Sequence, residues 1–131
     1  GKAYNYSQIS YPFQEFTNEI NDLVDSINEV LNFKPNNCLI NYYLDGKSKM
    51  GFHSDQTDIL HENTGVGIIS LGETRVLRFR SIADRNAIKD FELPSGSFIY
   101  MRNVIQDEWQ HAIPKSQTTK GRMSLTFRKI K

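Results

Sequence analysis

The apolar residues of this chain change their spacing once, at Pro35, and this change limits the fold more than any other feature of the sequence. From Pro12 to Leu31 they recur at intervals of three and four residues, which predicts one amphipathic helix. Pro12 suits the first turn of that helix, and Asn32 followed by Pro35 suits its end. After Pro35, short apolar runs alternate with Gly, Asp, Asn and Pro, which predicts strands joined by turns.

Eight runs after the helix have the length and composition of strands. They are Cys38–Leu44, Met50–His53, Val66–Leu71, Arg75–Arg80, Lys89–Leu93, Ser97–Met101, Trp109–Ile113 and Arg122–Ile130. One helix followed by eight strands predicts an α+β domain, mainly β, built as an antiparallel sandwich or jelly roll with the helix bracing one sheet. We expect one domain over residues 1–131, because this length does not allow a second core.

Composition excludes several classes of protein. Sixteen Lys and Arg against fifteen Asp and Glu give a net charge of +1, so attraction to a polyanion would have to come from local basic clusters. Apolar runs of a few residues fall far short of the roughly 20 that a membrane-spanning helix needs. Cys38 is the only cysteine, which excludes an intrachain disulfide and a cysteine zinc site. We expect a buried thiol and a reducing, cytoplasmic location, or the nucleus in a eukaryotic cell.

Two histidines and one aspartate have the residue types of a metal site. His53 and Asp55 are two residues apart, so in an extended segment both side chains point to the same side. His111 lies in an apolar predicted strand, where an imidazole without a partner would be costly to bury. Two other interpretations stay open, a hydrogen-bonded surface pair for His53 and Asp55 and a core histidine bonded to a backbone carbonyl for His111. The remaining histidine, His61, lies in a polar loop and is expected at the surface.

Two imidazoles and one carboxylate, with three positions left open, are typical of the non-haem Fe(II) oxygenases, and zinc is the competing metal. The co-substrate pocket distinguishes the two. 2-Oxoglutarate carries two negative charges, one at the metal and one at its far end. The far carboxylate therefore needs a cation of its own.

The last predicted strand supplies such cations. Its alternation places an apolar set on one face and a polar set on the other, namely Met123, Leu125 and Phe127 against Arg122, Ser124, Thr126 and Arg128. Arg122 with Ser124 suits a carboxylate, whereas Arg128 beside Lys129 is also typical of a strand end exposed to water. Alternation likewise turns Asn41 and Tyr43 to one side, toward one pocket. A turn residue and a core aromatic would explain these two separately.

In this order, Asn41-x-Tyr43, His53-x-Asp55, His111 and Arg122-(x5)-Arg128 resemble the AlkB family of Fe(II)/2-oxoglutarate dioxygenases. The likeness covers nearly the whole chain. It implies a double-stranded β-helix, or jelly roll, whose mouth holds Fe(II) through His53, Asp55 and His111. It further implies that 2-oxoglutarate, used together with O2, is bound by Asn41, Tyr43, Arg122, Ser124 and Arg128, with Arg122 and Ser124 at its far carboxylate.

The resemblance also implies a substrate, alkylated DNA or RNA. Family members hydroxylate an N-methyl group of a nucleobase, which then releases formaldehyde, while succinate and CO2 leave as co-products. The target base must be flipped out or single-stranded to reach the metal. The expected substrate contacts are Tyr4, Tyr6, Thr57, Asp58 and Trp109. The two tyrosines match those of the family's nucleotide-recognition lid, although packing against the helix would also explain them.

Departures from the family pattern concern the substrate. Many relatives carry an acidic residue two positions after the iron-binding aspartate, where this chain has Thr57, with Asp58 one step later. The chain opens at Gly1 rather than Met. We expect residues 1–10 to be a remnant of the lid, whose first recognition hairpin is either trimmed from this sequence or was never present.

Scattered basic residues form either a solvated face or the rim of a groove for phosphates; they include Lys47, Lys49, Arg75, Arg78, Arg80 and Arg85.

The first hypothesis for the function is a monomeric oxidative demethylase (dealkylase) with no membrane association. The alternatives are a hydroxylase of a protein side chain or small metabolite on the same fold, and a catalytically silent jelly-roll binding module.

Overall fold

The computed structural model describes residues 5–6, 9–10 and 14–131. The elements in chain order are β1 (Asn5–Tyr6), β2 (Ile9–Ser10), α1 (Asn18–Leu31), β3 (Asn37–Tyr43), β4 (Met50–His53), β5 (Gly65–Gly72), β6 (Arg75–Ser81), β7 (Ile88–Leu93), β8 (Phe98–Arg102), α2 (Asn103–Glu108), β9 (Trp109–Ile113) and β10 (Arg122–Arg128). Neither helix among these residues has the length and hydropathy to span a membrane.

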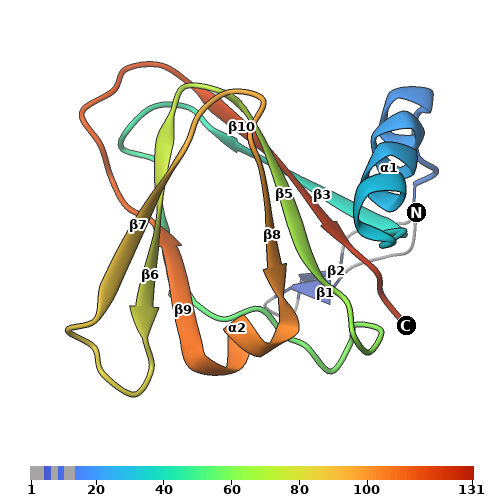
Figure 1. Ribbon diagram of the computed structural model, residues 1–131. Helices are drawn as coiled ribbons and strands as arrows, with labels where there is room; N and C mark the ends of the chain where they lie inside the picture. The colour runs from blue at the N-terminus through green and yellow to red at the C-terminus, as the bar shows by residue number, and fades with distance from the viewer. Residues whose placement is uncertain (1–4, 7–8, 11–13) are drawn as a thin grey trace.

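Two antiparallel sheets face each other, with strand orders β3-β10-β5-β8 and β4-β9-β6-β7, while β1 pairs with β2 alone (Figure 1). Most successive strands lie in opposite sheets, which is the winding of a double-stranded β-helix. The predicted jelly roll is confirmed, and all eight predicted strands are present with ends shifted by two residues at most. The last strand ends at Arg128, and Ile130 beyond it makes only an isolated bridge to Leu60.

Helix α1 begins later than the periodicity predicts. The Thr17 side chain accepts a hydrogen bond from the Ile20 backbone N–H at 3.2 Å, which caps the helix at Asn18. Residues 14–16 precede it without helical structure, and Pro12, the predicted first-turn residue, lies outside the described residues. The predicted end is confirmed, because Asn32 adopts a left-handed conformation with φ of 51°.

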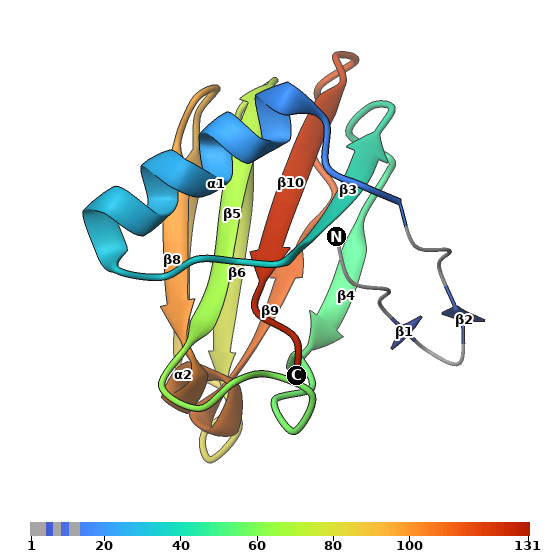
Figure 2. The same ribbon diagram turned by 90° about the vertical axis from the view of Figure 1, so that its right-hand side faces the viewer.

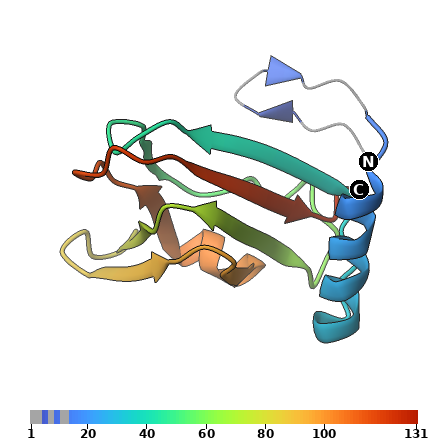
Figure 3. The ribbon, with the colours of Figure 1, turned by 90° about the horizontal axis from the view of Figure 1, so that it is seen from above.

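The apolar face of α1 packs on the outer face of the first sheet (Figure 2). Val24 and Ile27 of the helix form a buried cluster with Leu125 and Phe127 of β10. Cys38 is half-buried against this cluster, and burial raises the pKa of its thiol to about 11, so the thiol is a poor nucleophile. Seen from above, the helix lies at one end of the paired sheets (Figure 3). Because the apolar face of β10 packs under α1, the polar face of β10 is left to line the space between the sheets.

Arg75 does not line the rim of a groove for phosphates, which is one of the two interpretations of the scattered basic residues. Its side chain is buried, with 2% of the residue exposed. The guanidinium donates hydrogen bonds to the backbone carbonyls of Asp45, Ser48 and Pro114, at 3.1, 2.8 and 2.8 Å. Arg75 thus holds two loops against the end of β6. A charge that faces three carbonyl oxygens inside the protein is structural and is not available to a phosphate.

Two other central arginines are also engaged within the protein. Arg78 forms a two-point ion pair with Asp90 at 2.8 and 2.9 Å. Arg80 lies over the Phe52 ring, 3.9 Å from its centroid, and donates to Gln110 at 2.9 Å. Arg85 is exposed in the loop before β7. These contacts favour the solvated face over the phosphate groove.

Replacing Arg75 should destabilise the fold far more than replacing Arg78. Arg75→Met leaves three half-buried carbonyls without their donor, and at about 1 kcal/mol for each of them the loss should reach about 3 kcal/mol. Arg78→Met removes a half-exposed ion pair worth less than about 1 kcal/mol. Urea denaturation of both variants measures the difference. Equal midpoints for the two variants would contradict this structural role of Arg75.

Candidate metal centre

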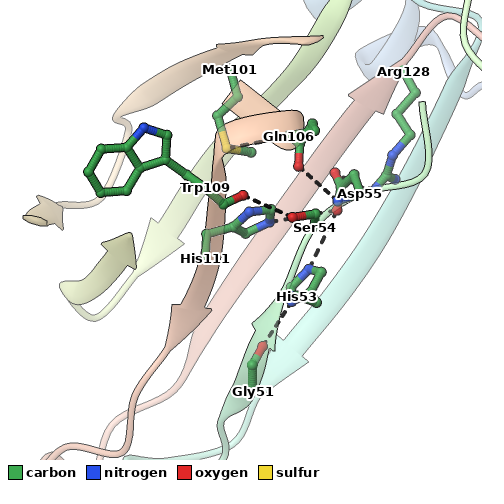
Figure 4. A network of polar contacts seen from close by, with 9 residues as sticks. All are labelled: Gly51, His53, Ser54, Asp55, Met101, Gln106, Trp109, His111 and Arg128. Atoms are coloured by element: carbon green, nitrogen blue, oxygen red, sulfur yellow. Dashed lines mark hydrogen bonds and ion pairs between the residues drawn. The ribbon is translucent and has the colours of Figure 1, made fainter. Parts of the chain in front are cut away.

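Three side chains far apart in the sequence meet between β4 and β9. His53 ends β4 and pairs directly with His111 of β9, and Asp55 follows two residues after His53. The Asp55 Oδ1 atom lies 3.4 Å from His53 Nε2 and 3.6 Å from His111 Nε2. One ligand atom from each of the three residues lies within 4.8 Å of the others (Figure 4). The structure thus brings together the trio that the sequence predicts.

The carboxylate of Asp55 is buried and ionised. Only 5% of its side chain is exposed, and Arg128 donates from Nη2 to its second oxygen at 3.2 Å. Burial acts to raise the pKa of this carboxyl, but the hydrogen bond with His53 and the charge of Arg128 outweigh burial and hold the pKa at about 2. Asp55 therefore presents a negative oxygen at neutral pH.

The two imidazoles differ in their surroundings. The His53 Nδ1 atom lies 2.8 Å from the Gly51 carbonyl. A donor N–H at Nδ1 leaves the lone pair of Nε2 directed toward Asp55 and a metal. Burial opposes protonation of His53, but its hydrogen bonds to Asp55 and Gly51 raise the pKa above the ordinary value.

His111 is a neutral imidazole in this structure. Burial lowers its pKa to about 4, despite the opposing charge of Asp55. Its Nδ1 atom is buried and finds no hydrogen-bond partner among the described residues. This observation overturns the interpretation of a core histidine bonded to a backbone carbonyl. The donor set of two imidazole nitrogens and one carboxylate oxygen fits Fe(II) with three open positions.

A cavity between the sheets is lined by the metal trio and by every residue that the sequence assigns to the co-substrate. Its polar lining combines the metal trio with residues of β3 and β10, namely Asn41, Tyr43, Arg122, Ser124, Thr126 and Arg128. The register explains this grouping, because Arg122 pairs with Tyr43 and Ser124 pairs with Asn41. The polar face predicted for the last strand thus points into the space between the sheets. Apolar side chains such as Leu77 and Ile113 form the rest of the wall.

Arg122 is the largest of the almost fully buried side chains that line the cavity, with 2% of the residue exposed. Its Nη2 atom donates to Ser70 Oγ at 2.8 Å, and the guanidinium lies 5.1 Å from the centroid of the Tyr43 ring. Its Nε and Nη1 atoms have no hydrogen-bond partner among the described residues. Ser70 is a contact that sequence reasoning did not assign to the site.

Arg128 lies at the metal end of β10 and Arg122 at the opposite end. The side chain of Arg128 is 6% exposed and bonded to Asp55, so the interpretation of an arginine exposed to water is wrong. Five residues of extended strand lie between the two arginines, and the six steps from one to the other correspond to roughly 20 Å between their Cα atoms. A small dianion can therefore lie between them only if long side chains reach toward it.

The expected substrate contacts are not gathered at this cavity. Trp109 is half-buried and lines a separate cavity with residues of β6, β7, β8 and α2, namely Phe79, Lys89, Phe91, Ile99, Tyr100, Met101 and Ile105. Thr57 and Asp58 follow Asp55 in an irregular segment, where Thr57 is half-buried and Asp58 exposed. Tyr4 lies outside the described residues, and for Tyr6 the structure describes only its backbone pairing with Ile9 in β1 and β2. His61 is exposed, as predicted.

Comparison with known proteins agrees with this geometry. A family model described as the 2OG-Fe(II) oxygenase superfamily matches residues 1–128. The chain is 27% identical over 142 residues to "Alpha-ketoglutarate-dependent dioxygenase alkB homolog 3" of Mus musculus, covering 95% of this chain and 50% of that protein. It is 28% identical over 138 residues to "DNA oxidative demethylase ALKBH2" of Homo sapiens, covering 99% of this chain and 53% of that protein. The chain thus spans about half the length of these relatives.

A solved structure described as "The structure of OsALKBH1" shares the fold, with a TM-score of 0.62 and 23% sequence identity. The match covers 82% of this chain and 61% of that one. The resemblance to AlkB proteins is therefore confirmed by sequence as well as by fold. Fe(II) and 2-oxoglutarate are the metal and co-substrate that the family and the trio of His53, Asp55 and His111 imply. Since the family model covers almost the whole chain and the metal trio is assembled, this chain belongs to the 2OG-Fe(II) oxygenase superfamily.

Proposed function

We propose that this chain is a Fe(II)/2-oxoglutarate-dependent dioxygenase that oxidatively demethylates N-alkylated nucleobases in DNA or RNA. The products would be the repaired base, formaldehyde, succinate and CO2. One observation carries the proposal: the metal trio shares a cavity with a buried arginine, Arg122, that has two unused donors. This arrangement suits a metal chelator with a second, distant carboxylate better than it suits a zinc-bound water alone.

His53, Asp55 and His111 would hold Fe(II), which together with 2-oxoglutarate and O2 supplies the oxidation of a C–H bond. Burial keeps the His111 imidazole neutral, the bond between His53 Nδ1 and the Gly51 carbonyl turns His53 Nε2 toward the metal position, and Asp55 stays ionised. Arg128 matters here because it holds one carboxylate oxygen and leaves the other, Oδ1, between the two histidines. One carboxylate against a divalent ion leaves a net charge of about +1, which attracts an anionic co-substrate.

Arg122 would bind the far carboxylate of 2-oxoglutarate, with the Ser124 hydroxyl beside it. Burial lowers the pKa of Arg122, because water no longer solvates the guanidinium, so an anion at this place would stabilise the charged form. Hydrogen bonds between a guanidinium and a carboxylate are strong when both are shielded from water. Asn41 and Tyr43 line the same wall from β3 and would orient the co-substrate. Arg128 would contact its metal-binding end.

The nucleobase substrate is supported by the relatives, one of which is described as a DNA oxidative demethylase. Hydroxylation of an N-methyl group gives a hemiaminal whose C–N bond then breaks, so that formaldehyde leaves and the base nitrogen recovers its proton. We place residues 1–10, with Tyr4 and Tyr6, at the nucleotide-recognition lid, and Thr57 and Asp58 beside the base. Hydroxylation of a protein side chain or metabolite remains the competing hypothesis, because Thr57 stands where many relatives have an acidic residue.

Mass spectrometry tests the reaction. The iron-loaded chain is incubated with 2-oxoglutarate and a panel of N-methylated DNA and RNA oligonucleotides, and the expected result is loss of the methyl group with equal amounts of formaldehyde and succinate. His111→Ala serves as the control, because two remaining ligands should not retain the metal.

Two other outcomes would contradict the proposal in different ways. Succinate formation with hydroxylation of a non-nucleic substrate and no formaldehyde would favour the hydroxylase. A chain that binds iron and 2-oxoglutarate but converts no substrate of either class would favour the silent binding module.

Arg122→Met should weaken the binding of 2-oxoglutarate and leave metal binding unchanged. The loss of charge-assisted hydrogen bonds of about 1.5–3 kcal/mol corresponds to roughly 10- to 150-fold in KM for 2-oxoglutarate. Arg85→Met, which removes an exposed arginine, is the matched control and should behave like the unchanged chain. Unchanged affinity for 2-oxoglutarate in Arg122→Met would show that the far carboxylate binds elsewhere.

A further inference from the structure

We propose that Gln106 is a positioning residue that sets the affinity of the metal centre by fixing the backbone of Asp55. Gln106 touches neither the metal trio's ligand atoms nor the co-substrate cavity. It belongs to α2, an element that the sequence analysis did not predict. The inference rests on the proposed function, since it assumes that His53, Asp55 and His111 bind a metal.

Gln106 is buried and directed at the metal-binding segment. Only 4% of the residue is exposed, and its Oε1 atom accepts a hydrogen bond from the Asp55 backbone N–H at 2.8 Å. Its Nε2 atom faces the sulfur of Met101 at 4.0 Å, a weak acceptor (Figure 4). The one strong hydrogen bond found for this buried amide is therefore the bond to Asp55.

A second hydrogen bond links Ser54, the residue before Asp55, to the residue that follows α2. The Ser54 hydroxyl donates to the Trp109 carbonyl at 2.9 Å. Trp109 begins β9, the strand that carries His111 two residues later. Two consecutive residues, Ser54 and Asp55, are thus bonded to the continuous segment formed by α2 and the start of β9. We call these two bonds the 54–55 tie.

The 54–55 tie acts where the sheet no longer restrains the chain. Strand β4 ends at His53, and residues 54–57 have no regular structure. The ladder between β4 and β9 therefore places the two histidines but not Asp55. Without the Gln106 bond, Arg128 would still hold the Asp55 carboxylate, but the backbone N–H of Asp55 would have lost its partner. The backbone that carries the ligand would then have to be ordered when the metal binds. That ordering lowers affinity, and loss of a residue supporting a metal ligand typically costs 10- to 100-fold.

Metal titration of three variants tests the inference. Gln106→Met has a similar volume but no acceptor oxygen, whereas Gln106→Glu keeps one. Asp107→Asn changes the exposed neighbour on the same helix and is the matched control. Calorimetry measures the Kd for Mn²⁺ without nucleic acid or 2-oxoglutarate, and a thermal melt of the metal-free chain reports folding.

Gln106→Met should raise the Kd for Mn²⁺ by about 10- to 100-fold. Gln106→Glu should restore the affinity, and Asp107→Asn should match the unchanged chain. An unchanged Kd in Gln106→Met would overturn the inference. A lower melting temperature in both Gln106 variants with no difference between their Kd values would also overturn it, since that pattern reports packing alone.

Gln106→Asn keeps the inference testable if Gln106→Met does not fold. It retains a polar amide but is one methylene shorter and loses the reach to the Asp55 N–H, so a raised Kd for Mn²⁺ supports the inference and an unchanged Kd overturns it. The measurement also separates the two proposals. A chain with the expected variant pattern that is inert toward methylated oligonucleotides contradicts the proposed substrate and leaves the role of Gln106 standing.

Discussion

The ionised carboxylate of Asp55 is the group around which the site is arranged. A buried charge is tolerated only when other groups compensate it. Here the compensation comes from both sheets, because Arg128 belongs to β10 in one sheet while His53 and His111 belong to β4 and β9 in the other. The metal centre is therefore also a polar link between the two layers. A change that moves the sheets relative to one another would disturb the ligand geometry directly.

Strand β10 shows how one short sequence serves the core and the site together. Its odd positions, Leu125 and Phe127, are buried under α1, which fixes the strand in the sheet. Its even positions then face the cavity, including Arg122 with its two unused donors. Burying a guanidinium without a full set of partners costs stability. An anionic co-substrate would offset that cost, so the fold retains at this place a feature that only a ligand makes favourable.

The parts of the structure that sequence reasoning predicted are those with strong local patterns. Strand β6 alternates between buried and half-buried residues, so its period of two is visible in the sequence. The metal trio is recognisable from residue types that are costly to bury alone. Helix α2 has six residues, too few to show a helical period, and Gln106 looks like an ordinary surface residue until the fold places it behind Asp55. Arg75 and Arg128 could not be told from solvated arginines, because the local pattern does not show which loops or layers cover a strand. The start of α1 differs from the prediction because apolar positions before Thr17 continue the helical spacing. The helical hydrogen bonds nevertheless begin only at the Thr17 cap.

Under the proposed function, the chemistry and the choice of substrate would depend on different parts of this molecule. The metal trio and the predicted co-substrate residues lie on or next to paired strands, where a change of residue disturbs register or packing. Thr57 and Asp58 lie in the irregular segment after Asp55, beyond the last ladder pair of β4. Side chains there can change without loss of a strand hydrogen bond. The 54–55 tie separates the two regions, because it holds Asp55 in place whatever follows it. One oxidising centre can thus be kept constant while the adjacent segment adapts to different C–H bonds, which is why membership of the family identifies the reaction type more firmly than the substrate.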